Sequence, residues 1–211
     1  WTYHAFNAWA NRIAASLAEA GVKAGDSVAI LMENRAETLA CVAAVVKLGA
    51  AAGMLNHQQR GEVLSHSIGL IAPKVIIVGS ECAEALASTP WQPGGEQGAL
   101  YFWDGSKAAP KGYTDLVKDS AKRSEKNPPS TVAVEARETC FYVFTSGTTG
   151  LPKASRMTHY RWLRGMAGLS QMAMRLKPTD IFYCCLPLYH NNALTVSWGA
   201  VLGSGGALVL S

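Results

Sequence analysis

The sequence contains few charged residues and no long apolar run. Charged residues make up 16% of the 211 residues, whereas hydrophobic residues make up 49%, and this balance excludes a chain that is disordered throughout. No uninterrupted apolar stretch reaches the roughly 18 residues that a membrane-spanning helix needs. Nothing at the start of the sequence resembles a signal peptide. Lys and Arg number 19 against 15 Asp and Glu, an excess that we interpret as spread along the chain and too small to indicate a nucleic-acid-binding protein.

Cysteine is also scarce, and its pattern indicates a reducing compartment. The number of cysteines is odd and no C-x-x-C motif occurs, which argues against a disulfide framework and against a zinc site. We therefore expect free thiols, mostly buried, and a cytoplasmic location. The five residues are Cys41, Cys82, Cys140, Cys184 and Cys185. Because the sequence starts with Trp1 rather than Met and stops directly after an apolar run, we expect it to be an internal piece of a longer protein.

Apolar strands that alternate with helices predict an α/β fold. The first helix begins after Thr2, whose hydroxyl can cap it, and ends near Gly21. Further helices are predicted at residues 35–48, 60–68, 159–174 and 191–202, and strands at 27–32, 50–55, 74–79, 100–103, 141–144, 181–186 and 207–210. Strands that are apolar throughout are typical of a parallel sheet covered on both faces. We therefore predict a mainly parallel sheet flanked by helices.

The pattern weakens in the middle of the chain, where Pro and Gly are frequent. We expect residues 1–88 to form a first α/β lobe, residues 89–138 an irregular excursion or connector, and residues 139–211 a segment of the same domain that carries a phosphate-binding loop. The mixed-charge run 118–126 is interpreted as a solvated helix face or a loop. His4, His57, His66 and His159 share no spacing typical of a metal site and are predicted to be surface or helix residues.

The segment that indicates chemistry is Thr145–Lys153, with the sequence TSGTTGLPK. Gly147 and Gly150 allow the backbone to bend so that consecutive amides point at one place, as in loops that hold phosphate. Lys153 adds a positive charge. Four hydroxyl groups add donors without negative charge; they belong to Thr145, Ser146, Thr148 and Thr149. The spacing is not that of the phosphate loop G-x-x-x-x-G-K-[ST], because two residues separate Gly150 from Lys153. Since Pro152 disfavours a helix here, we expect a loop that wraps the phosphates rather than a helix N-terminus.

This string resembles the signature loop of the adenylate-forming (ANL) superfamily, which includes acyl-CoA synthetases, luciferases and adenylation domains. Residues 1–32, 47–56 and 186–190 resemble further stretches of that superfamily, in the same order. Asn56 stands where most members have Pro. Together with residues 185–190, the run 54–60 resembles the fatty-acid transport protein and very-long-chain acyl-CoA synthetase group, in particular its bacterial FadD type.

The resemblance implies a specific fold, reaction and set of residues. The chain would be part of the large N-terminal domain of an acyl-CoA synthetase, which joins a fatty acid and ATP to acyl-AMP and pyrophosphate and then transfers the acyl group to coenzyme A. Lys153 and His190 would be catalytic, His190 would also line the site of the fatty-acid carboxylate or acyl chain, and Thr145 would lie near Mg²⁺. The residues implied to bind ATP are Thr145, Ser146, Gly147, Thr148, Thr149, Gly150 and Lys153.

Several alternatives remain open at the level of the sequence. The later superfamily motifs have no match before Ser211, so the 211 residues alone are expected to be inactive. An acyl-AMP ligase that loads a carrier protein, or a fatty-acid transport or binding protein with a nucleotide switch, would share these motifs. Arg161 and Arg164 fall on one helical face near Tyr160, which we interpret as a solvated face, with peripheral membrane association as the alternative. The partner expected is a fatty acid and not a nucleic acid, whereas acyl chain length and homo-oligomerisation stay undetermined.

Overall fold

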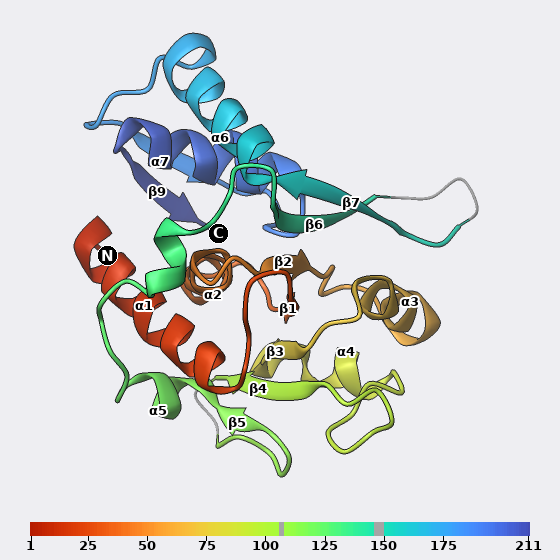
Figure 1. Cartoon of the computed structure of the whole chain (residues 1–211). Helices are drawn as coiled ribbons and strands as arrows, with labels where there is room; N and C mark the ends of the chain where they lie inside the picture. Colours follow the sequence, from red (N-terminus) through yellow and green to blue (C-terminus); the bar gives the residue numbers. More distant parts are fainter. Residues whose placement is uncertain (106–107, 146–149) are drawn as a thin grey trace.

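A seven-stranded sheet forms the centre of the molecule in the computed structural model, which describes residues 1–105, 108–145 and 150–211. Its strand order is β5-β4-β3-β1-β2-β6-β7 (Figure 1). Neighbouring strands from β5 to β6 are parallel, and only β7 runs antiparallel to its neighbour β6. The strands are β1 (Ser27–Leu31), β2 (Ala51–Met54), β3 (Val75–Gly79), β4 (Leu100–Asp104), β5 (Thr114–Asp115), β6 (Thr139–Thr145) and β7 (Lys153–Thr158). The predicted fold class is therefore confirmed.

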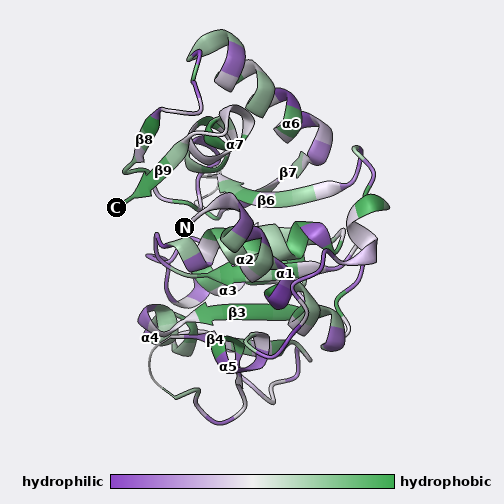
Figure 2. Ribbon diagram, turned by 90° about the vertical axis from the view of Figure 1, so that its left-hand side faces the viewer, coloured by the Kyte–Doolittle hydropathy of each residue, from purple (hydrophilic) through white to green (hydrophobic). Residues whose placement is uncertain are grey.

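Helices cover both faces of this sheet. Successive residues of a strand point to opposite faces, so a strand that is apolar at every position needs cover on both. Ile30 and Ile77 pack on one face with α1 (Tyr3–Glu19) and α2 (Ala36–Lys47). Leu31 and Ile76 pack on the other face with α3 (Gly61–Ile71) and α4 (Ala83–Ala87). Strand β3 is buried at every residue, and Figure 2 shows it as hydrophobic along its length. Burial on both faces explains why the sequence of these strands is apolar rather than alternating.

The first helix begins where the sequence predicts. The Thr2 hydroxyl accepts a hydrogen bond of 3.2 Å from the amide of Ala5, which satisfies one free amide of the first turn. At the other end Gly21 has a φ of 86°, in the left-handed region that favours glycine. Ile13 and Leu17 are fully buried against the sheet. The cap, the helix and its apolar face therefore all follow from local sequence.

A second, smaller layer lies beside the main sheet and contains the end of the chain. Strands β8 (Ile181–Cys184) and β9 (Ala207–Leu210) pair in parallel. Strand β8 contacts the π-helical segment η4 (Asn192–Gly199), which packs with α6 (His159–Ala167) and α7 (Ala200–Ser204), and both of these helices contact the π-helical segment η3 (Gly168–Ala173). Asn34, which follows β1, joins the two layers. Its side-chain amide donates to the carbonyls of Leu186 and Ser211, and its oxygen accepts from the amide of Leu188 at 2.8 Å.

The structure differs from the sequence-based expectation mainly between residues 89 and 158. Residues 89–138 contribute β4, β5, the short helix α5 (Leu116–Ser120) and the 3-10 turn η2 (Pro129–Val132), and the two strands extend the main sheet. Another 3-10 turn, η1 (Ser80–Cys82), leads into α4. Strand β7 was not predicted because it is an edge strand with largely polar and exposed residues, so it lacks an apolar pattern. The predicted helix 159–174 corresponds to α6 and η3, and the predicted strand 181–186 ends at Cys184.

The cysteines are free thiols, and four of the five are buried, as the sequence predicts. Burial raises the pKa of the Cys82 and Cys140 thiols to about 12. Both are therefore protonated at neutral pH and unsuited to nucleophilic attack. Within the described residues, no helix combines the length and the hydropathy that crossing a membrane requires.

Candidate functional site

The segment singled out in the sequence begins at the last residue of β6 and ends at the first residue of β7. Thr145 and Lys153 are paired directly across the two strands, and the Thr145 hydroxyl lies 3.5 Å from the Lys153 carbonyl oxygen. Because β6 runs parallel to β2, the β6–β7 hairpin extends beyond the carboxyl edge of the parallel strands (Figure 1), where α/β proteins bind ligands. The fold thus brings Thr145 and Lys153 together at this edge. Ser146, Gly147, Thr148 and Thr149 lie outside the described residues.

Gly150 is held in a conformation that requires glycine. Its φ is 87°, and no atom lies within 4 Å of the position that a Cβ would occupy. The need for glycine is therefore conformational and not steric. After Leu151 and Pro152 the chain enters β7, so among the described residues the arm that leaves the loop leads into a strand and not into a helix. This geometry agrees with a loop that surrounds a ligand.

Lys153 is exposed and faces a cavity of about 580 Å³ between α3 and the hairpin. The cavity is lined by His66, Leu70, Tyr142, Leu151, Pro152, Lys153, Ala154 and Arg156. Within the described parts of the chain, neither Lys153 nor Arg156 forms an ion pair with a carboxylate. Two cations without counter-ions beside a hydroxyl-rich loop are suited to bind an anion.

The positive charge is concentrated on this side of the molecule, which corrects the interpretation of a diffuse excess. Residues 1–138 contain 13 Lys or Arg and 14 Asp or Glu, whereas residues 139–211 contain six and one. The single acid is Asp180, so residues 139–179 contain none. The net charge of the whole chain does not show this division, because it sums the charges of the two parts.

His190 lies in the second layer, and its ring contacts that of Tyr189. Its ring centroid is 4.5 Å from that of Tyr189, which in turn lies 5.3 Å from the ring of His57. His190 itself is exposed, and Tyr189 is nearly buried. No hydrogen bond, ion pair or ring contact joins His190 to Thr145 or Lys153 among the described residues. The structure therefore places the two groups of predicted site residues on separate elements.

His57 is a ring near this edge to which sequence reasoning gave no role. It lies on no helix but three residues after the end of β2, and it is half-buried. Its Nδ1 is buried and has no hydrogen-bond partner in the described structure. The signal in the sequence is its position just after an apolar strand, at the same carboxyl edge as Thr145. His4, His66 and His159 lie on helices, as predicted.

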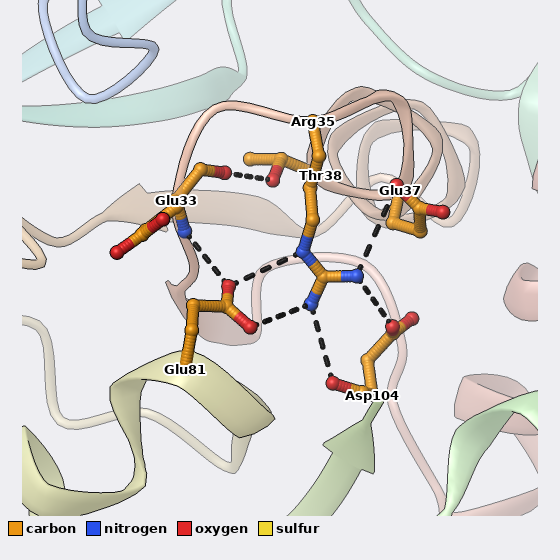
Figure 3. A network of polar contacts seen from close by, with 6 residues as sticks. All are labelled: Glu33, Arg35, Glu37, Thr38, Glu81 and Asp104. Atoms are coloured by element: carbon orange, nitrogen blue, oxygen red, sulfur yellow. Dashed lines mark hydrogen bonds and ion pairs between the residues drawn. The ribbon is translucent and has the colours of Figure 1, made fainter. Parts of the chain in front are cut away.

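A polar network at the same edge joins the ends of three strands (Figure 3). Arg35, just before α2, donates from Nη1 to the Asp104 carboxylate at 2.8 Å and from Nε to the Glu81 carboxylate at 3.2 Å. The Glu81 carboxylate also accepts from the amide of Glu33 at 3.0 Å. Glu37 lies 3.8 Å from the guanidinium. Arg35 and Glu81 follow β1 and β3, and Asp104 is the last residue of β4, so a polar residue at or after the end of each apolar strand is the signal that sequence reasoning missed.

Burial decides the electrostatics of this network. The Asp104 side chain is 6% exposed, and desolvation raises its pKa, while the hydrogen bond and the charge of Arg35 oppose that rise. The guanidinium also donates to the backbone carbonyl of Asp104 at 3.2 Å. Arg35 therefore stabilises the carboxyl edge by compensating a carboxylate that would be costly to bury alone.

Comparison with known proteins assigns the chain to a family. The family model described as "AMP-binding enzyme" matches residues 1–211. The chain belongs to this family. It is 47% identical to the medium/long-chain-fatty-acid–CoA ligase FadD6 of Mycobacterium tuberculosis, over 99% of this chain and 33% of that protein. It is 33% identical to human long-chain fatty acid transport protein 1, over 99% of this chain and 31% of that protein.

Solved structures agree with this assignment. A fatty acyl CoA synthetase from Mycobacterium tuberculosis matches with a TM-score of 0.83 and 26% identity, over 100% of this chain and 39% of that chain. ATP-bound MatB from Rhodopseudomonas palustris matches with a TM-score of 0.79 and 26% identity, over 98% and 39%. The family resemblance predicted from residues 145–153 and the fatty-acid branch predicted from residues 54–60 and 185–190 are therefore confirmed. The chain spans about a third of the length of the curated relatives it matches.

Proposed function

We propose that this chain is part of a fatty acyl-CoA synthetase and contributes the phosphate-binding side of its adenylation site. The observation that supports this most strongly is the β6–β7 hairpin, in which Gly150, with a φ of 87°, and Lys153 lie at the carboxyl edge of the sheet. In the reaction, a carboxylate oxygen of the fatty acid attacks the α-phosphorus of ATP. Pyrophosphate leaves, and the thiol sulfur of coenzyme A then attacks the acyl carbon of acyl-AMP and displaces AMP.

The charges of the hairpin fit this reaction. Negative charge shifts onto pyrophosphate as it leaves, and an ammonium group aimed at that charge stabilises the transition state. Lys153 is placed to do so, since no carboxylate competes for it among the described residues. Mg²⁺ is expected to enter with ATP, because this ion prefers carboxylate and phosphate oxygens and the hairpin offers it only hydroxyls such as that of Thr145. ATP and coenzyme A act as co-substrates.

The test uses the full-length protein, since the described chain is a third of its relatives' length. Purified protein with ATP and a long-chain fatty acid should release pyrophosphate only when the fatty acid is present, and should form the thioester when coenzyme A is added. Adenylate formation without transfer to coenzyme A would indicate a ligase that loads a carrier protein. Nucleotide binding without fatty-acid-dependent pyrophosphate release would contradict the proposal and favour transport or binding.

We assign His190 to the acyl side of the site. It is exposed at the carboxyl edge of the second layer, and its ring is fixed by contact with Tyr189. A neutral imidazole there can donate a hydrogen bond to a carboxylate without a permanent charge. Replacing it should therefore affect the fatty acid and not the nucleotide.

His190→Ala in the full-length protein is expected to raise the KM for the fatty acid about fivefold or more, the effect of one lost hydrogen bond, and to leave the KM for ATP nearly unchanged. Steady-state kinetics with a series of chain lengths provides the measurement. His4→Ala, at an exposed histidine of α1, is the matched control. A rise confined to the KM for ATP would show that His190 belongs to the nucleotide site.

We also assign a peripheral membrane contact to the exposed side of α6. Tyr160 and Leu163 are 54% and 46% exposed there, next to Arg161 and Arg164. The Arg164 guanidinium lies 5.6 Å from the centre of the Tyr160 ring and donates to its hydroxyl. A helix face with arginines and an aromatic ring is typical of an interface with anionic lipid, and the fatty-acid substrate partitions into such bilayers.

The full-length protein is expected to co-sediment with vesicles of phosphatidylcholine and phosphatidylglycerol more than with phosphatidylcholine alone. Arg161→Gln with Arg164→Gln should weaken this binding about 30-fold, because each basic residue at an anionic surface contributes about 1 kcal/mol. Lys111→Gln with Lys122→Gln removes the same charge from exposed positions elsewhere and should have little effect. Equal weakening by both pairs would show a general effect of net charge and no specific surface.

A further inference from the structure

A hydrogen bond from α3 reaches the arm of the hairpin that leads into β7. Nε2 of His66 lies 3.1 Å from the carbonyl oxygen of Pro152. A carbonyl oxygen can only accept, so Nε2 carries the proton in this contact and the imidazole is the donor. The two residues are 86 positions apart in the sequence, and the bond therefore fixes a tertiary arrangement.

The donor is fixed to a rigid part of the molecule. Helix α3 is anchored by Leu64 and Ile68, whose side chains are fully buried in the core beneath the sheet. On the same helix the Ser67 hydroxyl donates to the Gln59 side chain at 3.0 Å, which joins the helix to the segment before it. The position of His66 is thus set by the packing of α3 in this core, to which Phe144 of β6 also belongs.

The acceptor lies on the arm between the loop and β7. Pro152 is buried, has no amide hydrogen to donate, and comes just before Lys153, the first residue of β7 that pairs with β6. A cavity of about 580 Å³ lies between α3 and this part of the hairpin, whereas Tyr142 and Ala154 pack against the core on the α3 side. Within the described residues, the contact between His66 and Pro152 is the one hydrogen bond that joins α3 to the arm.

We propose that His66 is a positioning residue for the adenylation step. By holding the Pro152 carbonyl, it fixes where the backbone of Lys153 starts, and hence where the ammonium group meets the phosphates of ATP. In this role His66 acts through Pro152 and Lys153 and not directly on ATP or the fatty acid. The inference rests on the proposed function, because it needs Lys153 to act on phosphate.

This role predicts different effects on the two halves of the reaction. Adenylate formation needs Lys153 at the phosphates, whereas transfer of the acyl group from acyl-AMP to coenzyme A takes place after pyrophosphate has left. If His66 has a positioning role, its substitution therefore lowers the rate of the first step alone. A merely structural role of His66 would lower both steps, since both use the same folded domain.

In the full-length protein, His66→Ala is expected to lower ATP–pyrophosphate exchange about five- to tenfold, the effect of one lost hydrogen bond. The rate at which supplied acyl-AMP and coenzyme A form the thioester should stay unchanged. His66→Gln keeps an N–H donor and should recover most of the exchange. His4→Ala, on α1, is the matched control and should change neither rate.

The outcomes separate this inference from the proposed function. An equal loss in both half-reactions, no loss in His66→Ala, or a loss in His66→Gln as large as in the alanine variant would each overturn the positioning role while the wild-type rates still support the synthetase. Absence of fatty-acid-dependent exchange in the wild-type protein would overturn the synthetase itself, and the positioning role with it. Thermal unfolding of each variant confirms that the compared proteins are folded.

Discussion

Lys153→Ala in the full-length protein is expected to lower ATP–pyrophosphate exchange about 100- to 1000-fold, the loss that follows when one group aimed at developing charge is removed. Lys153 begins β7 directly across from Thr145, at the mouth of the loop, and no carboxylate neutralises it among the described residues. Because the side chain is exposed, its removal should leave the free energy of unfolding almost unchanged. Exchange kinetics and urea unfolding of the same preparation measure the two quantities.

Arg156→Gln is the matched control for this variant. Arg156 lies on the same strand and lines the same cavity, and its substitution removes the same charge. Its guanidinium, however, donates hydrogen bonds to the Thr139 hydroxyl, toward the far end of the hairpin. A loss of only a few fold is expected. Near-normal exchange in Lys153→Ala, or an equal loss in both variants, would show that the cavity provides a general positive field and that Lys153 has no specific role.

The second large effect is expected on stability. Arg35→Met should lower the free energy of unfolding by about 3 kcal/mol, because it leaves the buried Asp104 carboxylate without the cation that compensates it. Glu81 loses its partner in the same change. Lys118→Met, which breaks the exposed pair with Asp115, is the control and should cost less than about 1 kcal/mol. Urea unfolding measures both, and equal effects would contradict the role of burial.

The pH dependence of the Arg35→Met variant follows from the direction of the Asp104 shift. Burial raises the pKa of Asp104 in the folded state above its ordinary value of 3.8, and removing Arg35 raises it further because Arg35 opposes the shift. The folded state then binds a proton more tightly than the unfolded state, so its stability falls as the pH rises through the folded pKa. The deficit of the variant should therefore be smaller at about pH 5 than at about pH 8.

The sequence was informative wherever the local pattern and the tertiary structure agree. The apolar run 75–78 became the fully buried strand β3, and Thr2 capped α1 through its hydroxyl. Both follow from interactions within a few residues or from burial on both faces of a parallel sheet. The hydroxyl-rich loop was likewise placed correctly after an apolar strand, since β6 ends at Thr145.

Contacts between distant segments could not be predicted in this way. Strand β7 is polar and exposed, and only its pairing with β6 makes it a strand. The contacts of Arg35 with Glu81 and Asp104 depend on the order of strands in the sheet, which a single sequence does not specify. His66 meets Pro152 for the same reason. The residues that support the site are therefore those that sequence reasoning missed.

The pairing of β2 with β6 has a consequence for the order of folding. Strands β6 and β7 are close in sequence, so their hairpin can form locally. Pairing of β6 with β2, in contrast, requires Ala52 and Phe141, which are distant in sequence, to come together. Closing so long a loop lowers the conformational entropy of the chain before the stabilising contacts form, and pairings of this kind therefore form slowly. β2 must pair with β6 before the hairpin joins the main sheet, because β2 is the strand that separates it from β1 and β3. The phosphate loop is thus expected to become functional late in folding, after the centre of the sheet is already assembled.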